Sequence, residues 1–298
     1  MRWAVPALLA VPVLDSAIGM LTMSHGRKLA IDVYGADSEG EYISIALPGF
    51  SNPPASFGLG AQRVLGGLGP MLVVRHCNKV VFDDIYQALL NELARLAVKG
   101  RRKIIVYGHS MGGLLGVLFR ERYEQEGSPF GKIEILFLDC TPTGGRTLRT
   151  SVSPELIKLF LRLYRGGPIG ALLVAMFNLM ARQRMSLSLD ETADKALYKR
   201  YARGLMWYNN CAVISQLRFI LEFVLPEEPH HTATRVVYIG AEEPEIDMLV
   251  NQALAVEEWR RVFPHLEYRQ NPCVGHAQIM QQPRGYRTMI NEIVKEAA

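Results

Sequence analysis

The sequence predicts an α/β fold in which helices flank a mostly parallel central sheet that carries an inserted helical cap. Three observations support this prediction. Short apolar runs alternate with helical segments in two blocks of the chain, a purely helical region separates the blocks, and a glycine-rich turn joins a strand to a helix in the first block. Such alternation is typical of parallel sheets, because parallel strands need crossover connections. The 298 residues, 49% of them hydrophobic, are enough for a large core.

The first block contains five predicted strands and two predicted helices. Apolar, often β-branched runs predict the strands, which lie at 28–34, 42–47, 71–75, 103–107 and 133–138. Leucine and isoleucine recur at helical spacing in 83–98 and predict an amphipathic helix there, and a second helix is predicted at 111–123. Because the stretch 48–56 is rich in Gly, Pro and Ser, we expect it to form a loop.

A helical region without a convincing strand follows the first block. Its predicted helices are rich in Leu, Met, Phe and Tyr, and they lie at 154–164, 168–181, 190–207 and 210–225. The alternation then resumes, with strands predicted at 236–239 and 266–269, a helix at 248–262 and a last helix after His276. We therefore expect one sheet domain, built from residues 1–145 and 230–298, that is interrupted by a cap at 146–229.

Composition argues against several classes of function. The net charge of +4 comes from Lys and Arg that are scattered singly or in pairs, so no nucleic-acid partner is predicted. The four cysteines lie far apart, without a C-x-x-C pair or a histidine at metal-ligand spacing. We therefore expect no metal, no cofactor and free thiols, as in a cytoplasmic protein. The apolar segment 3–14 resembles a signal peptide but contains two prolines, and peripheral membrane contact through it or the cap is the alternative.

The glycine-rich turn at 108–112 reads Gly-His-Ser-Met-Gly, which is a G-x-S-x-G motif. A β-branched strand enters it and an apolar helix leaves it. A nucleophile at a sharp strand-to-helix turn needs backbone room, which the flanking glycines supply. The N-terminus of the following helix also favours developing negative charge. We predict that Ser110 is a catalytic nucleophile.

A serine hydroxyl needs an imidazole that takes its proton and later returns it to the leaving group. His276 is predicted for this role, because it lies on a loop between the last predicted strand and the closing helix. That loop is at the same edge of the sheet as Ser110. His109 lies inside the turn itself, and we expect its side chain to point away from the serine.

The third group must be a carboxylate that orients the imidazole. We predict Glu243, which lies at the turn just past a predicted strand. Asp247, Glu242 and Asp139 are alternatives. Asp247 directly precedes a predicted helix, where an N-cap aspartate is expected, and in that role its loss would only lower stability. Asp139 ends another predicted strand, from which a carboxylate can also reach the base.

Acyl transfer places negative charge on the carbonyl oxygen, and backbone N–H groups usually stabilise it. One N–H should come from Met111, which follows the predicted nucleophile. The second should come from Phe50, on the loop after the strand at 42–47. Gly49 lets the backbone approach a substrate closely there. Phe50 and Met111 are therefore the predicted oxyanion hole.

Three segments resemble the α/β-hydrolase family in order and spacing. They are 47–50 (Leu-Pro-Gly-Phe), 108–112 (Gly-His-Ser-Met-Gly) and 275–276 (Gly-His). The resemblance runs from about residue 28 to the C-terminus. The segment 240–244 (Gly-Ala-Glu-Glu-Pro) resembles the family's acid motif, with glutamate where aspartate is commoner. Pro48 stands where the family often has histidine.

The resemblance implies a serine hydrolase with a helical cap. Serine at the turn argues against haloalkane dehalogenases and epoxide hydrolases of this family, which use aspartate there. We predict an esterase or lipase that acts on a small ester with a hydrophobic acyl group, since the cap contains apolar runs such as 172–177. The alternatives are a thioesterase, acyltransferase, C–C hydrolase or cofactor-free haloperoxidase with the same triad, or a non-catalytic relative that binds a hydrophobic ligand.

Overall fold

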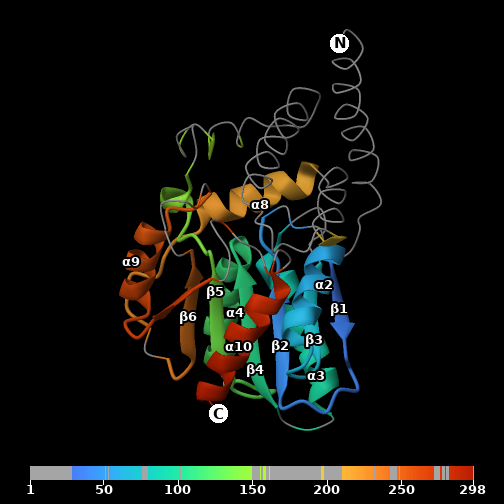
Figure 1. Ribbon diagram of the computed structural model, residues 1–298. Helices are drawn as coiled ribbons and strands as arrows, with labels where there is room; N and C mark the ends of the chain where they lie inside the picture. Colours follow the sequence, from blue (N-terminus) through green and yellow to red (C-terminus); the bar gives the residue numbers. More distant parts are fainter. Residues whose placement is uncertain are drawn as a thin grey trace.

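Figure 1 shows the protein as a computed structural model. The structure describes residues 29–149 except 51, 53, 76–79, 99 and 101; residues 155, 157, 158, 161, 196 and 197; residues 210–241 except 231; residue 247; and residues 249–297 except 272–275, 277, 278, 280 and 281. The N-terminal segment 3–14 lies outside these residues. No helix within the described ranges has the length and apolar character needed to cross a membrane.

A seven-stranded sheet with the order β1-β3-β2-β4-β5-β6-β7 forms the centre of the molecule. The strands are β1 (Ala30–Tyr34), β2 (Tyr42–Leu47), β3 (Met71–Arg75), β4 (Lys103–His109), β5 (Ile133–Asp139), β6 (Arg235–Gly240) and β7 (Glu267–Gln270). β1 is antiparallel to β3, and every other pair is parallel. The carboxyl ends of β2 to β7 therefore meet at one edge, where ligands bind in open α/β sheets.

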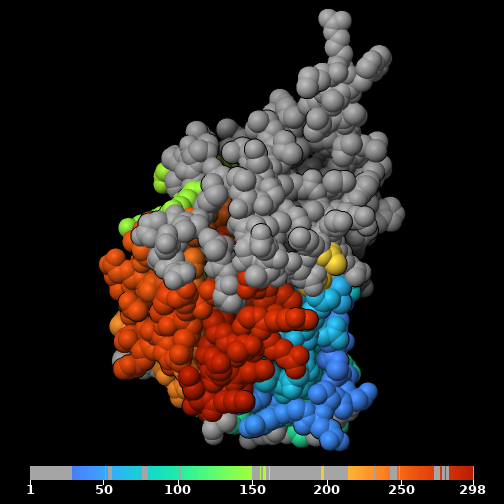
Figure 2. All heavy atoms as spheres, in the orientation of Figure 1, coloured from blue at the N-terminus to red at the C-terminus, as the bar shows by residue number. Residues whose placement is uncertain are grey.

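Helices cover both faces of the sheet, so both faces belong to the core. The helices are α2 (Pro54–Leu65), α3 (Phe82–Ala97), α4 (Met111–Gln125), α8 (Asn210–Glu222), α9 (Gln252–Val262) and α10 (Pro283–Ala297), with a 3-10 turn η1 (Gly145–Thr147). One apolar cluster joins the sheet to α3, α4 and α9, and the other joins it to α2 and α10. Figure 2 shows the second face, where α10 in red adjoins α2 in light blue.

Strand residues alternate between these two clusters. In β2, Ile43 and Ile45 belong to the cluster with α3 and α4, whereas Tyr42 and Ala46 belong to the cluster with α2 and α10. Successive side chains of a strand point to opposite faces, and a parallel sheet buries both. This is why the strands read as continuous apolar runs in the sequence.

The predicted fold class, an α/β-hydrolase fold, is confirmed, but one helix lies where none was predicted and another begins later than predicted. Helix α2 begins at Pro54, inside the predicted loop 48–56, and continues through a region where no helix is predicted. Proline is well tolerated in the first turn of a helix, where its missing N–H is not needed. Helix α9 begins at Gln252 rather than at residue 248, because Asn251 caps it by accepting the backbone N–H of Leu254 at 3.4 Å.

Of the helices predicted in the region 146–229, α8 has described bounds, and its predicted span was 210–225. The helices predicted at 154–164, 168–181 and 190–207 fall largely outside the described residues. Ile214 and Leu221 of α8 form a small apolar cluster with Leu161, and Phe50 and Leu148 pack against it. This contact brings part of the predicted cap region to the loop that follows β2.

Candidate active site

The predicted nucleophile lies at the junction of β4 and α4. The backbone of Ser110 has φ 50° and ψ −118°, a left-handed conformation that is unusual for a residue other than glycine. Its backbone N–H donates to the carbonyl of Asp139 at 2.7 Å, and its own carbonyl accepts the N–H of Gly113 at 2.9 Å. The turn is thus fixed between the end of β5 and the first turn of α4, in a strained geometry of the kind that a nucleophile elbow requires.

The glycines of the motif permit this close packing. A Cβ atom on Gly108 would lie 2.5 Å from the carbonyl oxygen of Gly112, and a Cβ on Gly112 would lie 2.0 Å from the carbonyl oxygen of Leu47. Both neighbours are backbone atoms, which cannot move aside as a side chain does. The motif therefore has a steric basis: only glycine lets α4 approach β2 and β4 at the elbow.

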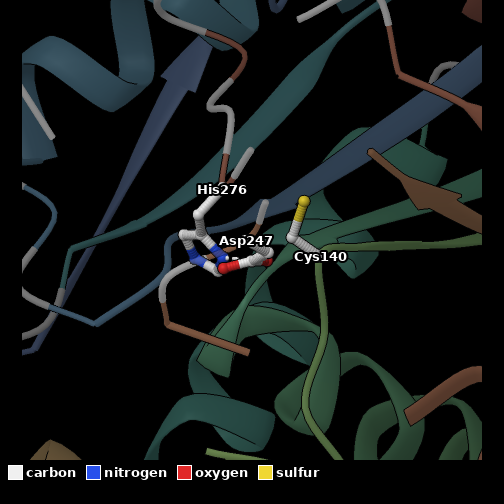
Figure 3. Close-up of side chains that lie close together, drawn as sticks. All are labelled: Cys140, Asp247 and His276. Atoms are coloured by element: carbon white, nitrogen blue, oxygen red, sulfur yellow. Dashed lines mark hydrogen bonds and ion pairs between the residues drawn. The ribbon is translucent and has the colours of Figure 1, made fainter. Parts of the chain in front are cut away.

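His276 lies between β7 and α10, and it is hydrogen-bonded to Asp247. Its Nδ1 is 2.9 Å from Asp247 Oδ2, and Figure 3 shows the imidazole facing the carboxylate. The imidazole is 8% exposed and the carboxylate is fully buried. Since a carboxylate only accepts, Nδ1 carries the shared hydrogen, and Nε2 is the nitrogen available as a base.

Charge and burial act against each other in this pair. Burial lowers the pKa of His276, but the charge of Asp247 and the hydrogen bond to it outweigh burial and raise the pKa above the ordinary imidazole value. Burial raises the pKa of Asp247, but His276 and the other hydrogen-bond donors outweigh burial and lower the pKa. Asp247 therefore stays ionised and can stabilise the imidazolium that forms during proton transfer.

The carboxylate that meets His276 is Asp247, where the sequence analysis preferred Glu243. Glu243 and Glu242 both lie outside the described residues. The N-cap interpretation of Asp247 is wrong, because α9 starts later and has its own cap. Asp247 Oδ1 instead accepts the backbone N–H groups of Leu249 at 2.8 Å and Val250 at 2.9 Å, which closes a turn ahead of the helix.

Asp139 is hydrogen-bonded to a different histidine, His109. Its buried carboxylate accepts hydrogen bonds from His109 Nδ1 at 3.0 Å, from the Tyr286 hydroxyl at 3.1 Å and from the Tyr107 hydroxyl. Burial lowers the pKa of His109 by more than the hydrogen bond and charge of Asp139 raise it, so the ring is neutral. The rings of His109 and His276 are 5.1 Å apart. A neutral His109 places no positive charge beside His276.

The loop after β2 lies directly against the elbow. A Cβ atom on Gly49 would lie 2.7 Å from His109 Cδ2, and the N–H of Asn52 donates to the carbonyl of Gly49 at 3.2 Å to close the turn. Phe50 follows Gly49 on this loop, and Met111 is the first residue of α4. Met111 directly follows Ser110 in the chain, and Phe50 follows the glycine that packs against His109, the residue before Ser110. Their role in binding an oxyanion remains a prediction.

Cys140 lies beside the His276–Asp247 pair. One atom from each of the three side chains lies within 4.8 Å of the others, which is close enough for a shared metal ion. Burial and the nearby carboxylates raise the pKa of the Cys140 thiol well above its usual range, so the sulfur is protonated. In this structure His276 and Asp247 are hydrogen-bonded to each other, which is an arrangement suited to proton transfer.

Comparison with known proteins agrees with the fold. The model of the Alpha/beta hydrolase family matches residues 25–287. No curated protein matches the sequence. Among solved structures, the chain is similar to an esterase from Exiguobacterium antarcticum, with a TM-score of 0.65, 11% identity, and coverage of 90% of this chain and 96% of that one.

Two further structures show the same fold. MenH from S. aureus has a TM-score of 0.59 and 13% identity, over 90% of this chain and 98% of that one. A putative aryl esterase from Burkholderia cenocepacia has a TM-score of 0.59 and 13% identity, over 90% and 94%. At such identities the likeness shows the fold and not the reaction. The match of the family model over most of the sequence shows that the chain belongs to the alpha/beta hydrolase family.

Proposed function

We propose that the protein is a serine hydrolase that cleaves carboxylic esters through an acyl-enzyme intermediate. The observation that carries this proposal is the hydrogen bond from His276 to the buried Asp247, at the sheet edge where Ser110 occupies a strained elbow. A buried imidazole with an ionised carboxylate on Nδ1 is suited to accept a proton on Nε2. The strained backbone of Ser110 supports its role as the nucleophile.

In the proposed reaction, Ser110 Oγ attacks the ester carbonyl while its proton moves to His276 Nε2. The backbone N–H groups of Phe50 and Met111 stabilise the oxyanion, and Asp247 stabilises the imidazolium. His276 then gives the proton to the leaving alcohol, and the acyl group stays on Ser110. A water molecule, deprotonated by His276, attacks the acyl-enzyme and releases the acid, which restores the free enzyme.

A hydrophobic acyl group is the proposed specificity. The apolar cluster of Leu161, Ile214 and Leu221 packs against Phe50, so apolar side chains of the predicted cap region adjoin one of the proposed oxyanion residues. Burial of each methylene group on such a surface favours binding by about 0.8 kcal/mol. We propose that the substrate is small, that no nucleic acid takes part, and that the protein is cytoplasmic, with peripheral membrane contact as the alternative.

A series of p-nitrophenyl esters of increasing acyl length, run beside the matching acyl-CoA thioesters, tests this proposal. We expect turnover of the esters, with kcat/KM rising as the acyl chain lengthens until the apolar surface is filled. The Ser110→Ala protein, prepared in the same way, measures background hydrolysis. Turnover of thioesters without turnover of esters would indicate a thioesterase instead of an esterase. No turnover of either substrate would contradict both activities.

The pH profile should show the state of His276. Its neutral form is the active base, so kcat/KM should fall as the pH drops through the pKa of His276. Because Asp247 raises this pKa, the midpoint of the fall should lie above the ordinary imidazole value, and Asp247→Asn should move it to lower pH. Initial rates in a series of buffers measure this. A flat profile from about pH 8 to about pH 5 would contradict a histidine base.

A further inference from the structure

Gln252 is the first residue of α9, and its side chain is fully buried. It reaches across to the end of β6, where its Oε1 accepts the backbone N–H of Ala241 at 2.7 Å. The preceding residue, Gly240, leaves room for this contact, since a Cβ atom there would lie 2.7 Å from the same Oε1. The sequence thus provides space for a glutamine that connects β6 to α9.

The contact with Ala241 fixes the orientation of the amide group. An N–H donor requires an oxygen opposite it, so Nε2 must occupy the other end of the amide. Nε2 lies within hydrogen-bonding distance of Asp247 Oδ2 and is 3.3 Å from Cys140 Sγ. The reversed amide would place two oxygens together at Asp247 and two N–H groups together at Ala241. Gln252 is therefore a donor to Asp247.

Four described groups donate to the Asp247 carboxylate. The backbone N–H groups of Leu249 and Val250 hold Oδ1, whereas Gln252 Nε2 and His276 Nδ1 share Oδ2. The hydrogen bond from Gln252 is one of the contributions that outweigh burial and lower the pKa of Asp247. A buried charge that loses one such donor is destabilised, and its oxygen is freer to rotate.

We infer that Gln252 is a positioning residue, whose amide N–H holds Oδ2 of Asp247 in the place where it meets His276. This inference rests on the proposed serine hydrolase function. Gln252 does not touch the reacting atoms, so it acts through Asp247. Its effect should appear in kcat and in the pH profile, whereas KM depends on the substrate surface and should change little.

Two variants distinguish a role of Gln252 in positioning Asp247 from a role in packing alone. Gln252→Met has a similar volume and no donor, and we expect it to lower kcat by about 10- to 100-fold at every pH, the size of one hydrogen bond to a charged group. Gln252→Glu keeps the shape. At low pH two neighbouring carboxyl groups share one proton and keep the hydrogen bond, whereas at high pH they repel. Its activity relative to the wild type should therefore fall as the pH rises.

Gln62→Met, at an exposed position of α2, is the matched control and should have wild-type kinetics. Rates are normalised to the protein that reacts with a fluorophosphonate, so a loss of folded enzyme is not counted as a loss of kcat. A wild-type protein that does not react with the fluorophosphonate would contradict the proposed serine hydrolase function, which is a different result from a failure of the role of Gln252. Wild-type kcat and pH profiles in both variants would overturn the positioning role.

If neither variant folds, measurements on the wild-type protein provide the test. The hydrogen on His276 Nδ1 should give a proton NMR signal at low field, and the side-chain N–H of Gln252 should exchange slowly with solvent. Both signals should move in Asp247→Asn. A Gln252 side-chain N–H that exchanges as fast as that of the exposed Gln62 would overturn the inference.

Discussion

Replacement of Ser110 by alanine is expected to lower kcat for ester hydrolysis by about 10,000-fold or more, because alanine has no hydroxyl that could form the acyl-enzyme. The oxyanion hole and the binding surface would remain, so a small residual rate above that in water is expected. The protein should keep its fold, since alanine tolerates the site at least as well as serine sterically. Steady-state kinetics with the best ester of the series measure the effect.

Ser44→Ala is the matched control for this variant. Like Ser110, Ser44 is a buried serine, but it lies within β2, and its hydroxyl has no hydrogen-bond partner among the described residues. Its loss should leave kcat unchanged. If Ser110→Ala retained more than about a tenth of the wild-type kcat, the nucleophile would have to be a different residue.

Asp247→Asn is expected to lower kcat by about 1,000- to 10,000-fold. The asparagine is isosteric, but it cannot stabilise the imidazolium of His276, and its amide nitrogen can turn toward Nδ1 and select the wrong tautomer. KM should change little, because Asp247 is buried behind the imidazole and does not contact a substrate. The measurement is kcat and KM at a pH where His276 is neutral.

Glu243→Gln is the control that compares the two acids directly. We expect it to retain nearly wild-type kcat, because the carboxylate that accepts the hydrogen bond from His276 is that of Asp247. The reverse pattern, with a large loss in Glu243→Gln and little loss in Asp247→Asn, would return the role of the acid to Glu243.

The sheet was predictable because its strands are short apolar runs between turn residues. The strand predicted at 42–47 is β2 itself, and β4 and β5 differ from their predictions only by extensions at the carboxyl end, to His109 and Asp139. Helix α2 could not be predicted in the same way, because Gly58 and Gly60 lower the local helix propensity. Its formation depends on the burial of Phe57 and its neighbours against the sheet, which is a tertiary effect.

The site was predictable where a local pattern has a steric cause. The motif at 108–112 needs glycines to bring α4 against β2, and such a constraint is visible in the sequence. The identity of the acid has no local signature, since several carboxylates follow β6 within a few residues. Which of them folds into the core depends on a histidine that is remote in sequence, His276, and on a backbone turn ahead of α9 that has no clear pattern of its own. Gln252 was missed because the sequence does not show that the first residue of α9 folds back to the end of β6 and to Asp247.

The most direct test of the central claim, that His276 activates Ser110 as a nucleophile, is the rate of covalent labelling by a fluorophosphonate, followed by peptide mapping. We predict that the wild-type protein is labelled on Ser110, and that His276→Ala is labelled at least about 1,000-fold more slowly. Labelling of another residue in the wild type, or equal rates in the two proteins, would contradict the claim.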